Sequence, residues 1–113
     1  MILMLWLMML LLNMELPYKI KVEPEAKNDL REAIAYYLSV APPKIAKNFL
    51  KEYTSIKDFI KHHPYQRKYR GELRGVIMKK YPYIVFYKVN DTEKQIIIKG
   101  IFNTYQDTSK YPE

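Results

Sequence analysis

Residues 83–102 read YIVFYKVNDTEKQIIIKGIF, and this stretch decides the fold. Its first part, Tyr83–Val89, and its last part, Lys94–Phe102, are rich in β-branched and aromatic residues, which favour strands. The four residues between them, Asn90–Glu93, are of types that form tight turns. The sequence therefore predicts two strong strands that are joined as an antiparallel hairpin.

Weaker strand signals precede this hairpin. Residues 69–80 read YRGELRGVIMKK and predict a third strand, which Gly71 and Gly75 should weaken or bend. Near the other end of the chain, apolar and charged residues alternate over 16–23, as in a half-buried strand. The polar tail from residue 103 to residue 113 is expected to be irregular.

Two helices are expected between the first strand and the others. Apolar residues recur at three- and four-residue spacing from Pro24 to Leu38, and again from Pro43 to Ile60. Ala41-Pro42-Pro43 separates the two patterns, since proline cannot continue a helix interior. The predicted order is β-α-α-β-β-β. This is an α+β fold in which a helical hairpin packs on one face of a small antiparallel sheet and leaves the other face open.

Composition limits the chemistry. The chain has 113 residues, which suffice for one hydrophobic core, and its 49% apolar and 27% charged residues are typical of a globular protein. Cysteine is absent, which excludes disulfides, thiolate nucleophiles and cysteine-ligated zinc. The sequence contains neither a glycine-rich phosphate loop nor a carboxylate cluster, so we predict no cofactor and no metal.

Positive charge is concentrated in the middle of the chain. The net charge is +7, and residues 44–80 alone carry eleven basic against three acidic residues. The segments on either side are close to neutral. This concentration indicates an anionic partner, which could be RNA, DNA or an acidic protein segment. The alternative is a solvated, lysine-rich helix face.

The first thirteen residues, MILMLWLMMLLLN, differ from the remainder of the chain. Twelve consecutive residues are apolar, which is fewer than the ~20 that a membrane-spanning helix needs. The basic start and the small-residue cleavage site of a secretory signal are missing. We interpret residues 1–13 as a leader outside the domain, which comprises residues 14–113, and we favour Met14 as the translation start. The alternative is a membrane-tethering or cryptic export segment.

The pattern as a whole resembles the RelE/ParE toxin superfamily over about residues 18–112. The resemblance is carried by the opening strand, the helix motif that begins at Glu25-Ala26, Ala46-x-x-Phe49, Pro64, the strand Tyr83–Tyr87, and the closing Ile98-x-x-Ile101-Phe102-Asn103-Thr104. Tyr81-Pro82-Tyr83 looks most like the ParE-like plasmid stabilisation branch. The resemblance implies a bacterial, cytoplasmic toxin of a type II toxin–antitoxin system, which a cognate antitoxin neutralises by wrapping around its helices and sheet.

The same resemblance bears on mechanism. Many relatives carry a histidine and an arginine after the closing strand, where this chain has Asn103 and Gln106, and Ile84 stands where ribonuclease members carry an arginine. The incomplete basic set favours the ParE type, which acts on DNA gyrase without a hydrolytic site. The alternatives are a RelE-like endoribonuclease that cleaves mRNA, with or without the ribosome, and an inactive member that only binds a partner.

Candidate site residues fall into two sets. The positions matching the family's functional residues, together with the nearest basic pair, are the candidates for catalysis: Lys79, Lys80, Asn103, Tyr105 and Gln106. The basic residues interleaved with tyrosines on the predicted second strand are the candidates for partner binding: Arg67, Arg70, Arg74, Lys79 and Lys80. For this second set a protein partner ranks first, a charged solvated edge strand second and RNA third.

Other polar residues have simpler interpretations. His62 and His63 precede Pro64 at a predicted helix end, where cationic side chains complement the helix dipole, so we expect capping rather than catalysis. Tyr83 and Tyr87 share a strand face with Val85, so we expect core packing.

The start site is directly testable. We expect the natively expressed protein to begin at Met14, because the domain pattern follows that residue directly. N-terminal sequencing of the native product measures this, and a product that begins at Met1 would contradict it.

Overall fold

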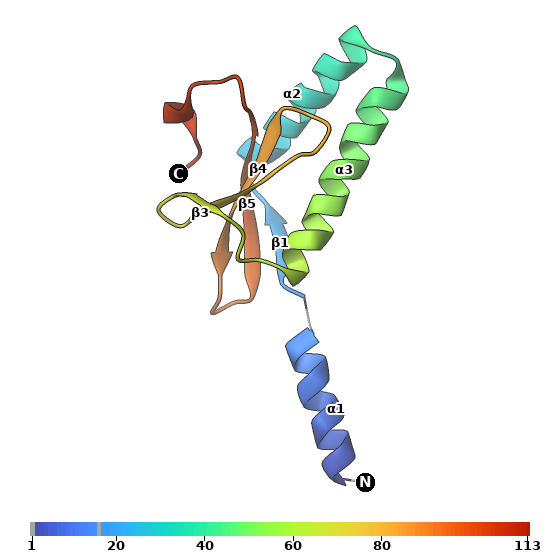
Figure 1. Ribbon diagram of the computed structural model, residues 1–113, viewed down its shortest axis with the longest axis vertical. Helices are drawn as coiled ribbons and strands as arrows, with labels where there is room; N and C mark the ends of the chain where they lie inside the picture. Colours follow the sequence, from blue (N-terminus) through green and yellow to red (C-terminus); the bar gives the residue numbers. More distant parts are fainter. Residues whose placement is uncertain (1, 16) are drawn as a thin grey trace.

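The computed structural model describes residues 2–15 and 17–113. Met1 and Leu16, the first residue of the expected opening strand, lie outside the described residues. The elements follow one another in the order α1 (Ile2–Glu15), β1 (Lys19–Val22), α2 (Pro24–Val40), α3 (Pro43–His62), β2 (Lys68–Arg70), β3 (Leu73–Ile77), β4 (Tyr83–Asn90), β5 (Gln95–Asn103) and the 3-10 turn η1 (Thr108–Lys110) (Figure 1). Beyond α1, this is the predicted α+β fold.

The sheet is mixed rather than purely antiparallel. Its strand order is β1-β5-β4-β3-β2, and the predicted hairpin of β4 and β5 lies at its centre. β1 pairs with β5 in parallel, with Ile20 opposite Ile96. The antiparallel sheet that the sequence predicted is therefore correct for β2 to β5 and wrong for β1. An isolated opening strand carries no local signal for its partner, because the partner lies far away in the sequence.

The predicted bent strand over 69–80 is in fact two strands and a loop. β2 and β3 form a tight antiparallel hairpin, in which Gly71 reverses the chain with a φ of 52°. Glycine adopts this left-handed conformation without the steric cost that a Cβ would impose. β3 ends at Ile77, so Lys79 and Lys80 lie in the loop before β4 rather than on a strand.

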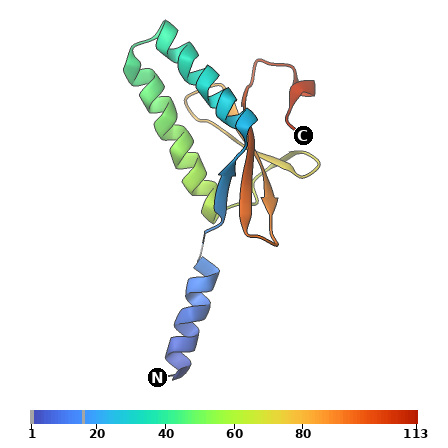
Figure 2. The same ribbon diagram turned by 180° about the vertical axis from the view of Figure 1, so that it is seen from behind.

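The helical hairpin covers one face of the sheet (Figure 2). Phe49, Tyr53 and Ile60 of α3 are buried against the helix-facing side of β4. The rings of Phe49 and Tyr83 lie 5.3 Å apart and nearly perpendicular, and the Tyr87 hydroxyl donates to the Pro64 carbonyl at 2.7 Å. The predicted core role of Tyr83 and Tyr87 is confirmed, because each is less than 10% exposed.

The opposite face is not open, in contrast to the prediction. A second buried cluster lies there, formed by Leu73, Ile84, Phe86 and Phe102. The C-terminal tail folds back over this cluster, and the Tyr111 ring lies 4.7 Å from Phe86 and 4.9 Å from Phe102. The tail is irregular as expected, apart from η1, but it serves as a cover because these apolar rings would otherwise face water.

A register shift in β5 attaches α2 to the sheet. Phe86 lies opposite Gly100 and Tyr87 opposite Ile98, so Lys99 is the extra residue of a bulge. The Asp29 carboxylate of α2 accepts a hydrogen bond from the Ile101 amide at 3.0 Å. Beside it, the Lys99 ammonium lies 2.9 Å from the Glu23 carboxylate. Two polar contacts thus hold the bulge against α2 and the residue before it.

Helix α1 projects away from this body in both views (Figures 1 and 2). Its first residues, from Ile2 to Met8, are exposed. None of the helices in the described part of the chain has the length and apolarity that crossing a membrane requires.

The close approach at Gly75 generates a stability prediction. A Cβ at this position would lie 2.9 Å from side-chain atoms of both Ile84 and Tyr69. We expect Gly75→Val to lower the free energy of unfolding by about 1–3 kcal/mol or more through overpacking. Urea denaturation measures the loss, with Glu72→Ala on the exposed turn as the control. A Gly75→Val variant as stable as the control would contradict this packing.

Candidate functional site

A cavity of about 520 Å³ lies between α2 and the end of β5 with the tail that follows it. Gly100, Ile101 and Phe102 of β5 border it, opposite α2. Asn103, Tyr105 and Gln106 also line it, so three of the five predicted catalytic candidates are brought together here. Tyr105 is 86% exposed, whereas Asn103 is half-buried at the end of β5.

The opposite wall of this cavity is acidic, which the sequence reasoning missed. Glu25, Asp29 and Glu32 of α2 line it, while Lys99 and Lys110 supply the positive charge. Burial raises the pKa of Asp29 above its ordinary value, against the lowering effect of its bond to the Ile101 amide. Their spacing of four and three residues puts the carboxylates on one helix face. The spacing of these carboxylates can be read from the sequence, but the sequence does not show that β5 and the tail lie opposite them.

The other two catalytic candidates lie elsewhere. Lys79 and Lys80 occupy the loop between β3 and β4, and both side chains are exposed. Their backbone amides donate to the Glu52 carboxylate of α3, at 3.2 Å for Lys80. Neither lysine lines the cavity. The five candidates therefore do not form one catalytic cluster.

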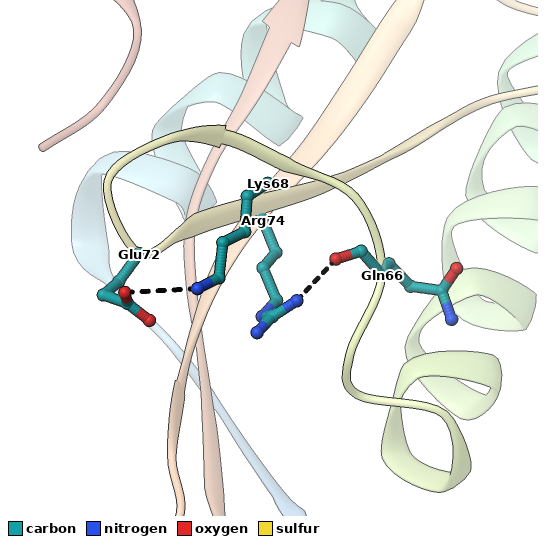
Figure 3. Close-up of polar contacts among 4 residues, drawn as sticks. All are labelled: Gln66, Lys68, Glu72 and Arg74. Atoms are coloured by element: carbon teal, nitrogen blue, oxygen red, sulfur yellow. Dashed lines mark hydrogen bonds and ion pairs between the residues drawn. The ribbon is translucent and has the colours of Figure 1, made fainter.

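The predicted partner-binding arginines gather on and beside the β2–β3 hairpin. We call this the basic hairpin and define it as Arg67, Lys68, Arg70 and Arg74. Lys68 pairs with Glu72 at 3.3 Å, and Arg74 donates to the Gln66 carbonyl at 2.7 Å (Figure 3). Lys79 and Lys80 follow the far end of β3 and are not part of it.

Each arginine of the basic hairpin stacks on a tyrosine. The guanidinium carbons of Arg67, Arg70 and Arg74 lie 4.7, 5.5 and 5.2 Å from ring centroids, and the rings are those of Tyr69, Tyr111 and Tyr65, respectively. Arg70 also donates to the Thr108 carbonyl at 2.9 Å. These contacts restrain long side chains before any partner arrives, which lowers the entropy cost of binding. The chemistry suits carboxylates or phosphates.

The two histidines behave as helix-end residues. His62 Nδ1 lies 3.0 Å from the Asp58 carbonyl one turn earlier, and the His63 ring lies 5.1 Å from that of Phe59. Both border a second cavity of about 440 Å³ that Tyr18 and Tyr65 also line. This placement supports the predicted capping role.

A carboxylate bridged by two tyrosines was not anticipated. Asp91 accepts hydrogen bonds from Tyr65 and from Tyr18, the latter at 2.9 Å. These two bonds lower the pKa of Asp91. The cluster joins the start of β1, the segment after α3 and the β4–β5 turn, so its evident role is to hold these three segments together. Among the described residues, no group of three or more potential ligands could hold a metal ion.

Comparisons with known proteins show one family, from a family model, and similar folds, from solved structures. Residues 20–107 match the family model described as the ParE toxin of the type II toxin–antitoxin system parDE. The fold is similar to a chain of the chromosomal ParDE system from P. aeruginosa, with a TM-score of 0.67 and 16% identity over 76% of this chain and 95% of that one. It is also similar to a chain of the RelBE2 toxin–antitoxin complex from Mycobacterium tuberculosis, with a TM-score of 0.52 and 16% identity over 77% and 98%. None of the curated proteins matches.

Asp29 generates a prediction with a pH dependence. Its raised pKa means that the folded protein binds a proton more readily than the unfolded chain. The contribution of Asp29 to stability should therefore grow as pH falls through the folded-state pKa, and be lost again as pH rises. Asp29→Asn keeps an acceptor for the Ile101 amide and removes the buried charge, so its melting temperature at neutral pH should equal or exceed that of the parent.

Asp29→Ala is the contrasting variant. It leaves the Ile101 amide without its acceptor, and we expect a loss of about 1–2 kcal/mol in the free energy of unfolding. Thermal denaturation of the three proteins between pH 3 and pH 7 makes the comparison, because this range spans the ordinary pKa of an aspartate carboxyl, about 3.9. Equal stabilities for Asp29→Ala and Asp29→Asn would show that the bond contributes nothing.

Proposed function

The chain belongs to the ParE toxin family of type II toxin–antitoxin systems, and from this premise we propose that it acts by binding a protein target, expected to be DNA gyrase, rather than by cleaving RNA. It is the toxin component of such a system, and its partner is a cognate antitoxin. The proposed target is cytoplasmic, and we propose the same location for the toxin.

The acidic cavity carries the argument against RNA cleavage. Cleavage through the 2′-hydroxyl needs a base, an acid and positive charge around the phosphate in the transition state. The cavity that holds Asn103, Tyr105 and Gln106 contains three carboxylates against two lysines. An RNA backbone is repelled by such a surface. The two histidines, the usual proton carriers, line a different cavity.

The basic hairpin supports protein binding. Its arginines are restrained by stacking on tyrosines, and arginine and tyrosine are the side chains that contribute most at protein interfaces. Three guanidinium groups and one ammonium outnumber the two nearby carboxylates, Glu72 beside Lys68 and Asp91 near Arg74, so the surface keeps excess positive charge. We propose that acidic residues of the antitoxin meet this surface, and that the target competes for it.

Induction of the chain in bacteria tests the proposed activity. Gyrase inhibition should stop growth and induce the DNA-damage response while mRNA remains intact. Growth curves, a damage-response reporter and primer extension on abundant transcripts make the three measurements. Prompt mRNA cleavage would replace this proposal with the RelE-like nuclease, and unimpaired growth would indicate an inactive partner-binding member.

The basic hairpin can be tested separately. Reversing charge at Arg70 and Arg74 to glutamate should raise the dissociation constant for the antitoxin at least about tenfold, since each lost charge contact contributes on the order of 1 kcal/mol. Calorimetric titration of the antitoxin measures it.

The matched control changes the same amount of charge elsewhere. Lys27→Glu with Lys44→Glu alters exposed residues of α2 and α3, and it should raise the dissociation constant clearly less than the arginine variant does. Circular dichroism melting verifies that both double variants are folded. An unchanged affinity in the arginine variant would remove the basic hairpin from the interface.

A further inference from the structure

Helix α1 is apolar on every side from Ile2 to Leu12. Residues 2–12 contain no charged or polar side chain, so no polar stripe exists along this part of the helix. The described side chains of its first two turns are about half to more than four-fifths exposed, from Leu7 at 48% to Ile2 at 84%. Trp6 is among them, 57% exposed. Figures 1 and 2 show that the helix points away from the sheet and the helical hairpin.

The distribution of apolar residues around α1 indicates whether a protein surface or a lipid environment would stabilise it. A helix that packs on a protein surface shows one apolar stripe and one polar face, as α3 does. A helix that is apolar all round needs apolar surroundings on all sides. The fourteen residues of α1 rise about 21 Å, which is less than the ~30 Å of a bilayer's hydrocarbon core. Its length therefore fits insertion into one leaflet rather than a crossing.

The segments near the C-terminal end of α1, which include the start of β1 and the end of α3, carry residue types that are typical of a membrane–water interface (Figures 1 and 2). We call it the collar and define it as Tyr18, Lys19, Lys61, Tyr65 and Lys94. The Tyr18 amide donates to the Lys61 carbonyl at 3.1 Å, which brings the end of α3 beside the start of β1. The Lys94 ammonium lies 5.1 Å above the Tyr18 ring, and the Tyr18 and Tyr65 hydroxyls lie 3.1 Å apart.

Two carboxylates contact residues of the collar, and each already has a partner there. Asp91 accepts from both tyrosines, and Asp58 lies 3.7 Å from the Lys61 ammonium. The three lysines of the collar outnumber these two carboxylates, so the collar keeps positive charge. Tyrosine and lysine are enriched where proteins meet lipid headgroups, and basic clusters there attract anionic lipids.

We propose that α1 and the collar form a docking site for an anionic lipid bilayer, in which α1 enters the hydrocarbon and the collar lies among the headgroups. The inference is independent of the proposed target, since the surface proposed for the antitoxin and the target is the basic hairpin and not α1. It requires a chain that begins at Met1, which is the alternative to the expected start at Met14, and N-terminal sequencing decides between the two starts.

Trp6 provides a local probe, because it is the sole tryptophan of the chain. The full chain is mixed with vesicles made of equal parts of phosphatidylcholine and phosphatidylglycerol. We expect the tryptophan emission to shift to shorter wavelength, brominated acyl chains to quench it, and the protein to float with the vesicles. Pure phosphatidylcholine vesicles should bind less protein, because they offer no charge to the collar.

Paired variants separate α1 from the body of the domain. Leu3→Glu with Leu7→Glu should lower vesicle binding at least tenfold. The matched control, Leu38→Glu with Val40→Glu, makes the same change on exposed apolar residues of α2 and should bind like the parent. Circular dichroism melting shows that both double variants retain the folded domain.

Three outcomes would overturn the proposal. The first is an unchanged emission spectrum with vesicles. The second is undiminished flotation of the Leu3→Glu, Leu7→Glu variant, which would assign binding to the basic body alone. The third is a blue shift that grows with protein concentration in vesicle-free buffer and is not increased by vesicles, which would make a second copy of the chain the partner of α1.

Discussion

Five consecutive residues of β4, from Tyr83 to Tyr87, are less than 10% exposed, so both faces of this strand must be covered by other parts of the chain. Alternate side chains of a strand point to opposite faces, and here neither face can be left in water without losing the burial that stabilises the fold. The helical hairpin covers the face of Tyr83, Val85 and Tyr87. The β2–β3 hairpin, through Leu73 and Tyr69, and the tail, through Tyr111, cover the face of Ile84 and Phe86.

This two-sided burial also determines where polar groups can gather. The tail crosses back over the sheet to place Tyr111, and in doing so it closes one side of the cavity opposite α2. The bulge at Lys99 lets Ile98 and Ile101 both join the helix-facing core. The Asp29 carboxylate of α2 accepts a hydrogen bond from the Ile101 amide. The acidic wall of the cavity is thus a consequence of how α2 is held to β5.

Charge is divided between two surfaces with different chemistry. Carboxylates of α2 dominate the cavity, whereas arginines and a lysine dominate the basic hairpin. For a ParE-family toxin this division favours recognition of acidic protein segments over chemistry on a phosphate backbone. The net charge of +7 does not reveal it, because net charge sums over surfaces that no single partner contacts together.

The sequence by itself determined helices α2 and α3, the β4–β5 hairpin, the family resemblance and the concentration of basic residues in the middle third, because periodicity and composition depend on neighbouring residues. Only the tertiary structure decided that β1 pairs in parallel with β5, that residues 69–80 fold as a hairpin and a loop, and that the tail covers the second face. It also decided that Asn103, Tyr105 and Gln106 face carboxylates. The Asp29–Ile101 bond joins residues 72 positions apart. Contacts of that separation depend on the packing of whole elements, and local pattern carries no information about them.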